Sequence, residues 1–227
     1  MRLFLHLFKK GILPVLFLLL LNVSVKAASD GLPRGAYDLP YTRYESESAT
    51  KGGSATLKVS TNYDQTNPAS EASDQKYVAL PSNGSSVSWN ITNSGAGVTL
   101  RFTMPDAPGG GAGLTGKLGF YVNNTLVKTI DLSSYWSYQY FNKYEHDPTN
   151  TPAALTYMRF DEVHFRLATK LNAGDVVKIQ KDNGDALEYG VDFIEVEETG
   201  NALPKPAGYL SVTDYGAIAN DGIFGTK

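Results

Sequence analysis

The sequence predicts an all-β protein built as an antiparallel β-sandwich. The chain is rich in aromatic residues and in glycine, with 14 Tyr, 10 Phe and 22 Gly, and this combination favours short strands joined by tight turns. Several segments alternate apolar and polar residues with a period of two, for example 98–104 and 160–168. No segment has the periodicity of an amphipathic helix.

Strands are expected at 43–49, 56–60, 76–80, 85–92, 98–104, 117–122, 125–132, 160–168, 175–181 and 191–197. Turn signals separate them. The sequence PSNGSS precedes one strand, NAGD precedes another, and Asn123 with Asn124 forms a two-residue hairpin signal. Short strands separated by such turns are typical of a sandwich of the jelly-roll type.

The two ends of the chain differ in composition from this region. Residues 1–27 carry an early positive charge, then an apolar run and small residues up to Ala27, the pattern of a secretory signal peptide. A membrane anchor is the alternative, but the run is shorter than the ~20 residues that a spanning helix needs. We therefore expect a secreted, extracellular protein with a linker at 28–42, the sandwich at 43–198, a second linker at 199–208 and a short segment at 209–227.

The charge balance and the absence of cysteine limit the possible partners. The formal net charge is −3, so the chain lacks the basic character of a nucleic-acid-binding protein. There is no Cys, so no disulfide stabilises the exported chain. A bound metal ion is a plausible substitute.

Two closely spaced carboxylates stand out near the start of the sandwich. Glu45 and Glu47 are two residues apart in RYESESA, so on a strand they share one face. They belong either to a charged edge strand that resists unwanted pairing or to a cation site. First and last strands of a sandwich often pair, and Asp192 on the last strand would then lie beside them. Such oxygen ligands suit Ca²⁺.

An aromatic cluster and a few titratable residues are the other candidates. SSYWSYQYFNKYEHD is expected to be a long loop whose aromatic rings either bind sugars or pack over one end of the sandwich. His146 beside Asp147 could do acid–base chemistry, whereas Asp161 and Glu162 would point to opposite faces of a strand and could not flank one bond. His164 is expected to face solvent. With no nucleophile motif either, we predict that this chain has no catalytic residues and is not an enzyme as it stands.

Several segments resemble a known family. They are QKYVALPSNGSSVSWNI, VTLRFTMPDAPGGG, GKLGFYVNNTLVKTIDL, LNAGDVVKIQKD and YGVDFIEVE. Their order over 43–198 resembles the β-sandwich carbohydrate-binding modules of families 6, 35 and 36. The closest resemblance is to the variant at the front of the catalytic unit in family 87 glycoside hydrolases, the α-1,3-glucanases called mycodextranases. LSVTDYGAIANDG, near the C-terminus, resembles the opening of a pectate-lyase-like right-handed β-helix.

The resemblance implies two sites. A structural Ca²⁺ would be held between the first and last strands by Glu45, Glu47 and Asp192. A carbohydrate would be bound in end loops that include Trp136, Tyr138 and Tyr189.

The resemblance also implies a role. In that family the catalytic aspartates belong to the β-helix. We therefore expect a non-catalytic accessory domain of an exported polysaccharide-degrading enzyme, which binds carbohydrate weakly or supports a catalytic β-helix. The alternative is a secreted surface or adhesion module without a sugar ligand. The expected partners are a polysaccharide such as α-glucan and a C-terminal β-helix domain, with no nucleic acid and no membrane after signal cleavage.

Overall fold

The computed structural model describes residues 41–64, 66–108, 113–141, 148–149, 155–157, 159–200 and 204–218. The expected signal peptide at 1–27 and the candidate pair His146 and Asp147 lie outside these residues. Within the described part of the chain, no helix has the length and apolar character needed to cross a membrane.

The described elements are mostly strands. Their bounds are β1 Tyr41–Glu45, β2 Thr50–Gly52, β3 Thr56–Val59, β4 Lys76–Leu80, β5 Ser86–Asn90, β6 Gly95–Thr103, β7 Thr115–Val122, β8 Thr125–Ser133, β9 Gln139–Phe141, β10 Pro148–Thr149, β11 Leu155–Tyr157, β12 Phe160–Leu171, β13 Val176–Gln180 and β14 Tyr189–Glu197. Short 3-10 turns occur at η2 Pro68–Glu71, η3 Ser73–Gln75 and η4 Val212–Tyr215.

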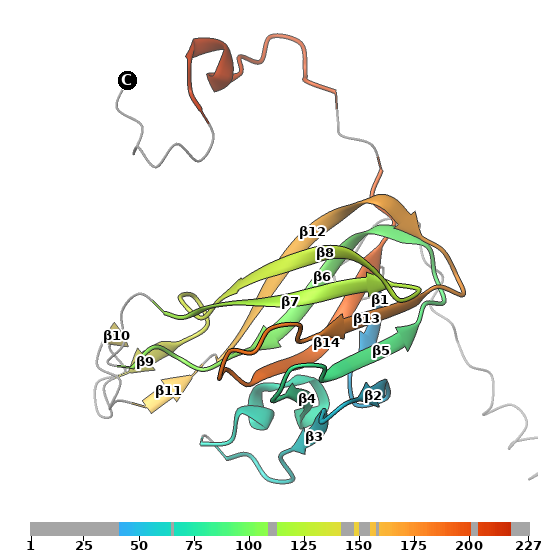
Figure 1. Cartoon of the computed structure of the whole chain (residues 1–227). Coiled ribbons are helices and arrows are strands. Elements are labelled where there is room, and N and C mark those ends of the chain that lie inside the picture. The colour runs from blue at the N-terminus through green and yellow to red at the C-terminus, as the bar shows by residue number, and fades with distance from the viewer. Residues whose placement is uncertain are drawn as a thin grey trace, which may run out of the picture. The chain divides into compact units, whose positions relative to one another are not determined.

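These strands form an antiparallel β-sandwich, as the sequence predicts (Figure 1). One sheet has the order β12-β6-β14-β4-β3, with β1 also paired to β14, and the other has the order β2-β5-β13-β7-β8. The alternation in β6 places Leu100 and Phe102 in the core between the sheets. The core residue Phe120 of β7 meets Phe165 of β12 edge to face, with ring centroids 5.2 Å apart.

The first and last strands pair, as expected, but the expected bounds of the first strand need correction. β1 runs antiparallel to β14, with Glu45 opposite Phe193. The expected first strand at 43–49 is too long, however, because the chain leaves the sheet at Ser46. That buried residue donates its backbone N–H to Asp192 O at 2.9 Å and its hydroxyl to Val191 O at 2.6 Å. Glu47 therefore lies beyond the end of β1 and not on the same strand face as Glu45.

Two other regions differ from expectation. Part of the aromatic segment predicted as one long loop is strand β9, which forms a small separate sheet of order β10-β9-β11 with two strands that follow the segment. Strands of two or three residues are too short to show a period of two in the sequence. In the described segment 204–218 the structure has the η4 turn and no strand, so the resemblance of this segment to a β-helix gains no support.

Candidate functional site

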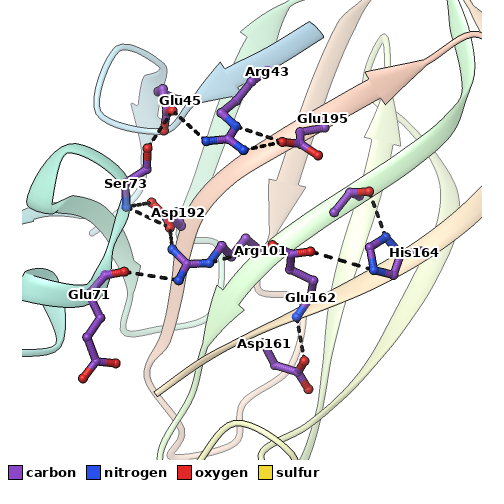
Figure 2. Close-up of polar contacts among 11 residues, drawn as sticks. Arg43, Glu45, Glu71, Ser73, Arg101, Asp161, Glu162, His164, Asp192 and Glu195 are labelled. Carbon is purple, nitrogen blue, oxygen red and sulfur yellow. Dashed lines mark hydrogen bonds and ion pairs between the residues drawn. The ribbon is translucent and has the colours of Figure 1, made fainter. Parts of the chain in front are cut away.

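The three predicted cation ligands belong to the region where β1 and β14 pair, and Figure 2 shows two of them, Glu45 and Asp192. Asp192 is fully buried, and the backbone N–H of Ser73 donates to both of its carboxylate oxygens at 3.1 Å. The guanidinium of Arg101 forms an ion pair with the same carboxylate. Burial raises the pKa of Asp192 to about 6, and Arg101 and the Ser73 N–H oppose this rise. At neutral pH the carboxylate is therefore mainly ionised.

Glu45 and Glu47 each have one oxygen atom with no protein partner. Glu45 Oε1 accepts a hydrogen bond from Ser73 Oγ at 2.9 Å. Glu45 Oε2 and Glu47 Oε2 are buried and accept no hydrogen bond from any described residue. Burial raises the pKa of Glu45, the Ser73 hydroxyl lowers it, and the charge of Glu47 raises it further. Buried carboxylate oxygens without partners are costly, so the arrangement favours a positive charge at this point.

An unusual turn positions Ser73. The η3 turn contains Asp74 at φ 49° and Gln75 at φ 55°, a left-handed conformation that is uncommon outside glycine. The turn directs the Ser73 amide to Asp192 and the Ser73 hydroxyl to Glu45 (Figure 2). Ser73 thus joins carboxylates from β1 and β14, which are 147 residues apart in the chain by numbering (192 − 45).

Arg101 approaches this group from β6. Its Nη2 donates to Glu71 O at 3.2 Å, its Nε lies 3.9 Å from Glu162 Oε1, and its guanidinium carbon lies 4.7 Å from the centroid of the Phe160 ring. On the other side, Arg43 Nη2 pairs with Glu195 Oε1 at 2.6 Å. Arg43 Nη1 also lies 3.9 Å from Glu45 Oε1. Asp192 and Glu45 therefore both have a cationic neighbour, and the oxygens without a hydrogen-bond partner among the described residues are Glu45 Oε2 and Glu47 Oε2.

The observed arrangement supports the predicted metal site only in part. Among the described residues, no group of three or more His, Cys, Asp or Glu side chains is arranged to hold a metal ion. Glu45 and Asp192 both contact Ser73, but Asp192 is already paired with Arg101. The orphaned oxygens of Glu45 and Glu47 suit a hard cation, so a calcium site with these three ligands stays a prediction.

The predicted sugar-binding residues are in very different environments. Trp136 is 79% exposed and packs edge to face on Tyr135, with ring centroids 4.5 Å apart. Tyr138 is half-buried, donates its hydroxyl to Met104 O at 2.8 Å, and has a pKa raised by burial to about 12.

The prediction for Tyr189 is wrong. Its ring is fully buried, and its hydroxyl donates to Asp185 Oδ2 at 2.5 Å. Gly116 leaves room for this hydroxyl, because a Cβ at that position would clash with it. A ring enclosed in this way cannot stack on a sugar.

A polar hollow lies beside the exposed aromatic pair. It has a volume of about 610 Å³ and is lined by Thr115, Gly116, Lys117, Asp131, Leu132, Ser133, Asn183 and Asp185. The Tyr135 amide donates to Ser133 Oγ at 3.1 Å, which places the Tyr135–Trp136 pair next to the hollow. Asn183 Oδ1 is buried and has no hydrogen-bond partner among the described residues. Hydroxyl groups of a carbohydrate could satisfy such groups.

The catalytic candidates on β12 do not form a paired-carboxylate site. Asp161 Oδ1 accepts the backbone N–H of Glu162 at 2.8 Å, whereas the Glu162 carboxylate lies 3.9 Å from both Arg101 and His164 (Figure 2). The side chain of His164 is 66% exposed, and its Nδ1 lies 2.9 Å from Thr99 Oγ1. The prediction that His164 faces solvent is confirmed.

Sequence reasoning missed Arg101, Asn183 and Asp185, and it missed the amide and hydroxyl contacts of Ser73. Arg101 occupies a polar position in an alternating strand, where an arginine ordinarily faces water. Asn183 and Asp185 lie in a polar turn before β14, a composition common to most loops. A position just before the last strand of a sandwich is the one signal that would have drawn attention to them.

The fold and these sites define a β-sandwich domain with a polar, aromatic-edged hollow. The family comparison is more specific. The chain belongs to the family described as alpha-1,3-glucanase catalytic domain D1, whose model matches residues 38–199. No curated protein sequence matches the chain.

Solved structures agree with this assignment. The catalytic domain of Agl-KA is 51% identical, with a TM-score of 0.76 over 82% of this chain and 32% of that chain. The catalytic unit of a thermostable GH87 α-1,3-glucanase from Streptomyces thermodiastaticus is 32% identical, with a TM-score of 0.64 over 80% of this chain and 30% of that chain. A GH87 α-1,3-glucanase catalytic domain in complex with nigerose is 26% identical, with a TM-score of 0.63 over 76% of this chain and 31% of that chain. The chain spans about a third of the length of these relatives.

These findings correct the functional prediction. The resemblance to family 87 glycoside hydrolases is confirmed, but the expected non-catalytic accessory domain, and the statement that the chain is not an enzyme, are wrong. The matching family is part of a catalytic domain, and the similar structures are catalytic domains. The prediction relied on the lack of a catalytic motif within 43–198. A segment of a catalytic domain need not carry such a motif itself.

Proposed function

We propose that the chain is the D1 part of the catalytic domain of an exported α-1,3-glucanase, a glycoside hydrolase acting on α-1,3-linked glucan. The observation that carries this proposal is the family match, which extends over the whole sandwich from residue 38 to residue 199. The nigerose complex of a relative supports an α-1,3-linked glucan as the substrate class. The signal-like residues 1–27 are consistent with an enzyme that meets its polysaccharide outside the cell.

A domain exchange tests this function. Residues 38–199 would replace the matching segment of the Agl-KA catalytic domain, which is 51% identical over the aligned region. We expect the chimera to release reducing ends from insoluble α-1,3-glucan at a rate within about tenfold of the parent, a loss below about 1.4 kcal/mol in barrier height. Dextran, which is α-1,6-linked, serves as the control substrate. A folded chimera without activity on α-1,3-glucan would contradict the proposal.

We further propose that the aromatic-edged hollow contacts the glucan substrate. Trp136 offers an exposed ring for the apolar face of a glucose unit, and Lys117, Asp131, Asn183 and Asp185 offer donors and acceptors beside it. The buried, unpartnered Asn183 Oδ1 supports a hydrogen-bonding ligand here. Because the hollow is open, binding of glucan to it should be weak, with a Kd of about 0.1–1 mM.

Replacement of the exposed ring tests this contact. Trp136→Ala should abolish retention of the protein on insoluble α-1,3-glucan in a pull-down assay. Tyr63→Ala is a matched control, because Tyr63 is also an exposed aromatic, at 64%, but lies in the loop after β3 and away from the residues of the hollow. Equal retention of wild type and Trp136→Ala would show that this tryptophan does not contact glucan.

Finally, we propose that Glu45, Glu47 and Asp192 bind a structural Ca²⁺. The support comes from the two orphaned oxygens of Glu45 and Glu47 and from the raised pKa of Glu45. When bound, the ion would supply positive charge to three neighbouring carboxylates and link β1 to β14.

A further inference from the structure

A groove of about 280 Å³ lies on the outer face of the sheet that contains β1, β14, β6 and β12. The alternation that places Leu100 in the core turns Gly97 and Thr99 of β6 to this outer face. In the register of the sheet, Glu197 of β14 is opposite Gly97 on one side and Arg166 of β12 is opposite it on the other. Because adjacent strands are about 4.8 Å apart, the backbones of these two charged residues are about 10 Å from each other.

The floor of the groove is Gly97, which has no side chain to fill the space between its two neighbours. It lies inside β6, a strand of nine residues, where a glycine weakens the strand and often marks the close approach of another group. A Cβ at this position would come within 2.6 Å of Thr199 Cγ2 and 3.5 Å of Glu197 Cβ. The glycine therefore keeps a gap open between the carboxylate of Glu197 and the guanidinium of Arg166.

The charged groups on the two walls retain hydrogen-bonding capacity. Arg166 donates from Nε to Thr199 Oγ1 at 3.3 Å, and within the described part of the chain neither of its other two guanidinium nitrogens has a partner. Glu197 likewise has no ion pair with a described residue, whereas its neighbour on the same face, Glu195, pairs with Arg43 at 2.6 Å (Figure 2). The groove thus offers a free acceptor on one wall and free donors on the other.

An aromatic ring and smaller polar groups complete the lining. Tyr41 of β1 is opposite Glu197 in the register and lines the same wall. On the other side, Thr99 Oγ1 and His164 Nδ1 lie 2.9 Å apart. A ligand that fits must donate to a carboxylate and accept from a guanidinium within one small space, beside a ring. A pyranose does so, because each hydroxyl both donates and accepts and its apolar face can pack on an aromatic ring.

We infer that this groove binds a glucose unit of the glucan, as a second carbohydrate site on the sandwich. The inference rests on the proposed function, because the family supplies the class of sugar. The aromatic-edged hollow is built by β7, β8 and the turn before β14, whereas the groove is on the face of the other sheet. Two weak sites that engage one polysaccharide retain it more strongly than either site alone.

An NMR titration of the chain with a soluble α-1,3-linked glucose tetrasaccharide tests the inference. The backbone amide signals of Gly97, Arg166 and Glu197 should shift with a Kd of about 1 mM. The dipeptide glycylglycine is the control ligand, because a zwitterion could pair with both walls without any hydroxyl group. The inference is overturned if the tetrasaccharide moves none of these signals, or if glycylglycine moves them at an equal or lower concentration.

Two variants of the groove and one matched control extend the test. Gly97→Thr fills the floor with a residue suited to a strand and should abolish the shifts. Arg166→Gln leaves the groove open but removes the guanidinium, so the Kd should rise at least about fivefold, and this variant decides the matter if Gly97→Thr does not fold. Lys58→Gln removes the same charge from β3, where Lys58 lies 3.9 Å from Glu188 and outside the groove, and should leave the Kd unchanged. Wild-type affinity in Arg166→Gln would overturn the inference.

The titration is independent of catalysis, so the two proposals can fail separately. A chimera that is inactive on α-1,3-glucan would contradict the proposed function even if the tetrasaccharide shifts the signals of the groove. An active chimera, together with a groove that does not respond to the tetrasaccharide, would contradict this inference alone.

Discussion

Lys181 has a buried ammonium group in an unusually complete cage of oxygen atoms. The side chain is fully buried, and Nζ donates to Asp185 O at 2.8 Å, Leu187 O at 2.5 Å and Pro81 O at 3.3 Å. It also forms an ion pair with Asp185 Oδ1 at 3.0 Å. The hydrogen bonds from Tyr189 and Lys181 outweigh the effect of burial and lower the pKa of Asp185. One ammonium thus holds the turn that carries two residues of the polar hollow, Asn183 and Asp185.

Removal of this charge should destabilise the fold strongly. Lys181→Met fills a similar volume but leaves three carbonyl groups without their donor and the 30% exposed Asp185 carboxylate without its cation. We therefore expect a loss of about 3 kcal/mol or more in the free energy of unfolding. Urea denaturation followed by fluorescence measures it. Lys117→Met is the control: that side chain is 63% exposed and pairs with the exposed Asp131, and its loss should cost below about 1 kcal/mol. Equal stability of the two variants would show that the cage contributes little.

At the scale of elements, the strands of the sandwich could be predicted because burial on one face produces alternation. The expected and observed strands coincide at Lys76–Leu80, and apart from β1 the others differ by no more than three residues at either end. The main error concerns β1. Nothing in RYESESA marks Ser46 as the residue that leaves the sheet, because its partners Val191 and Asp192 are 145 and 146 residues further along.

The candidate sites could be predicted only in part, because spacing within one strand is visible in the sequence and contacts between distant segments are not. The spacing of Glu45 and Glu47, with the pairing of first and last strands, indicates an acidic junction. The neutralising Arg101, from β6, and the positioning Ser73, from the η3 turn, depend on contacts between distant segments. Exposure is equally invisible in a sequence: Trp136 and Tyr189 both looked like ligand-binding aromatics, yet one is exposed and the other enclosed.

At the scale of the whole domain, closure of the sandwich brings carboxylates together from separate parts of the chain. Formation of the β1–β14 pair joins the first strand of the domain to its last, and the η3 turn attaches to both through Ser73. Contacts between segments so distant in sequence form only after much of the chain is ordered. The charge repulsion at this junction therefore acts directly against closure of the domain, and any ion bound there stabilises the folded state alone.

Removal of a bound cation is accordingly expected to lower the melting temperature. A ligand at a hundredfold excess over its Kd stabilises the folded state by about 2.7 kcal/mol, which for a domain of this size is a shift of roughly 5–10 °C. Calorimetric scans in EDTA and in Ca²⁺ should show this difference in melting temperature, and Mg²⁺ should restore little of it, because Mg²⁺ demands tighter octahedral geometry.

Glu47→Gln changes one of the two orphaned carboxylates and should remove most of the difference in melting temperature between EDTA and Ca²⁺. Glu198→Gln, at an exposed position paired with Lys170, should keep all of it. If the melting temperature of demonstrably metal-free protein equals that in Ca²⁺, the proposed calcium site is overturned, because an ion bound only by the folded state cannot leave its stability unchanged.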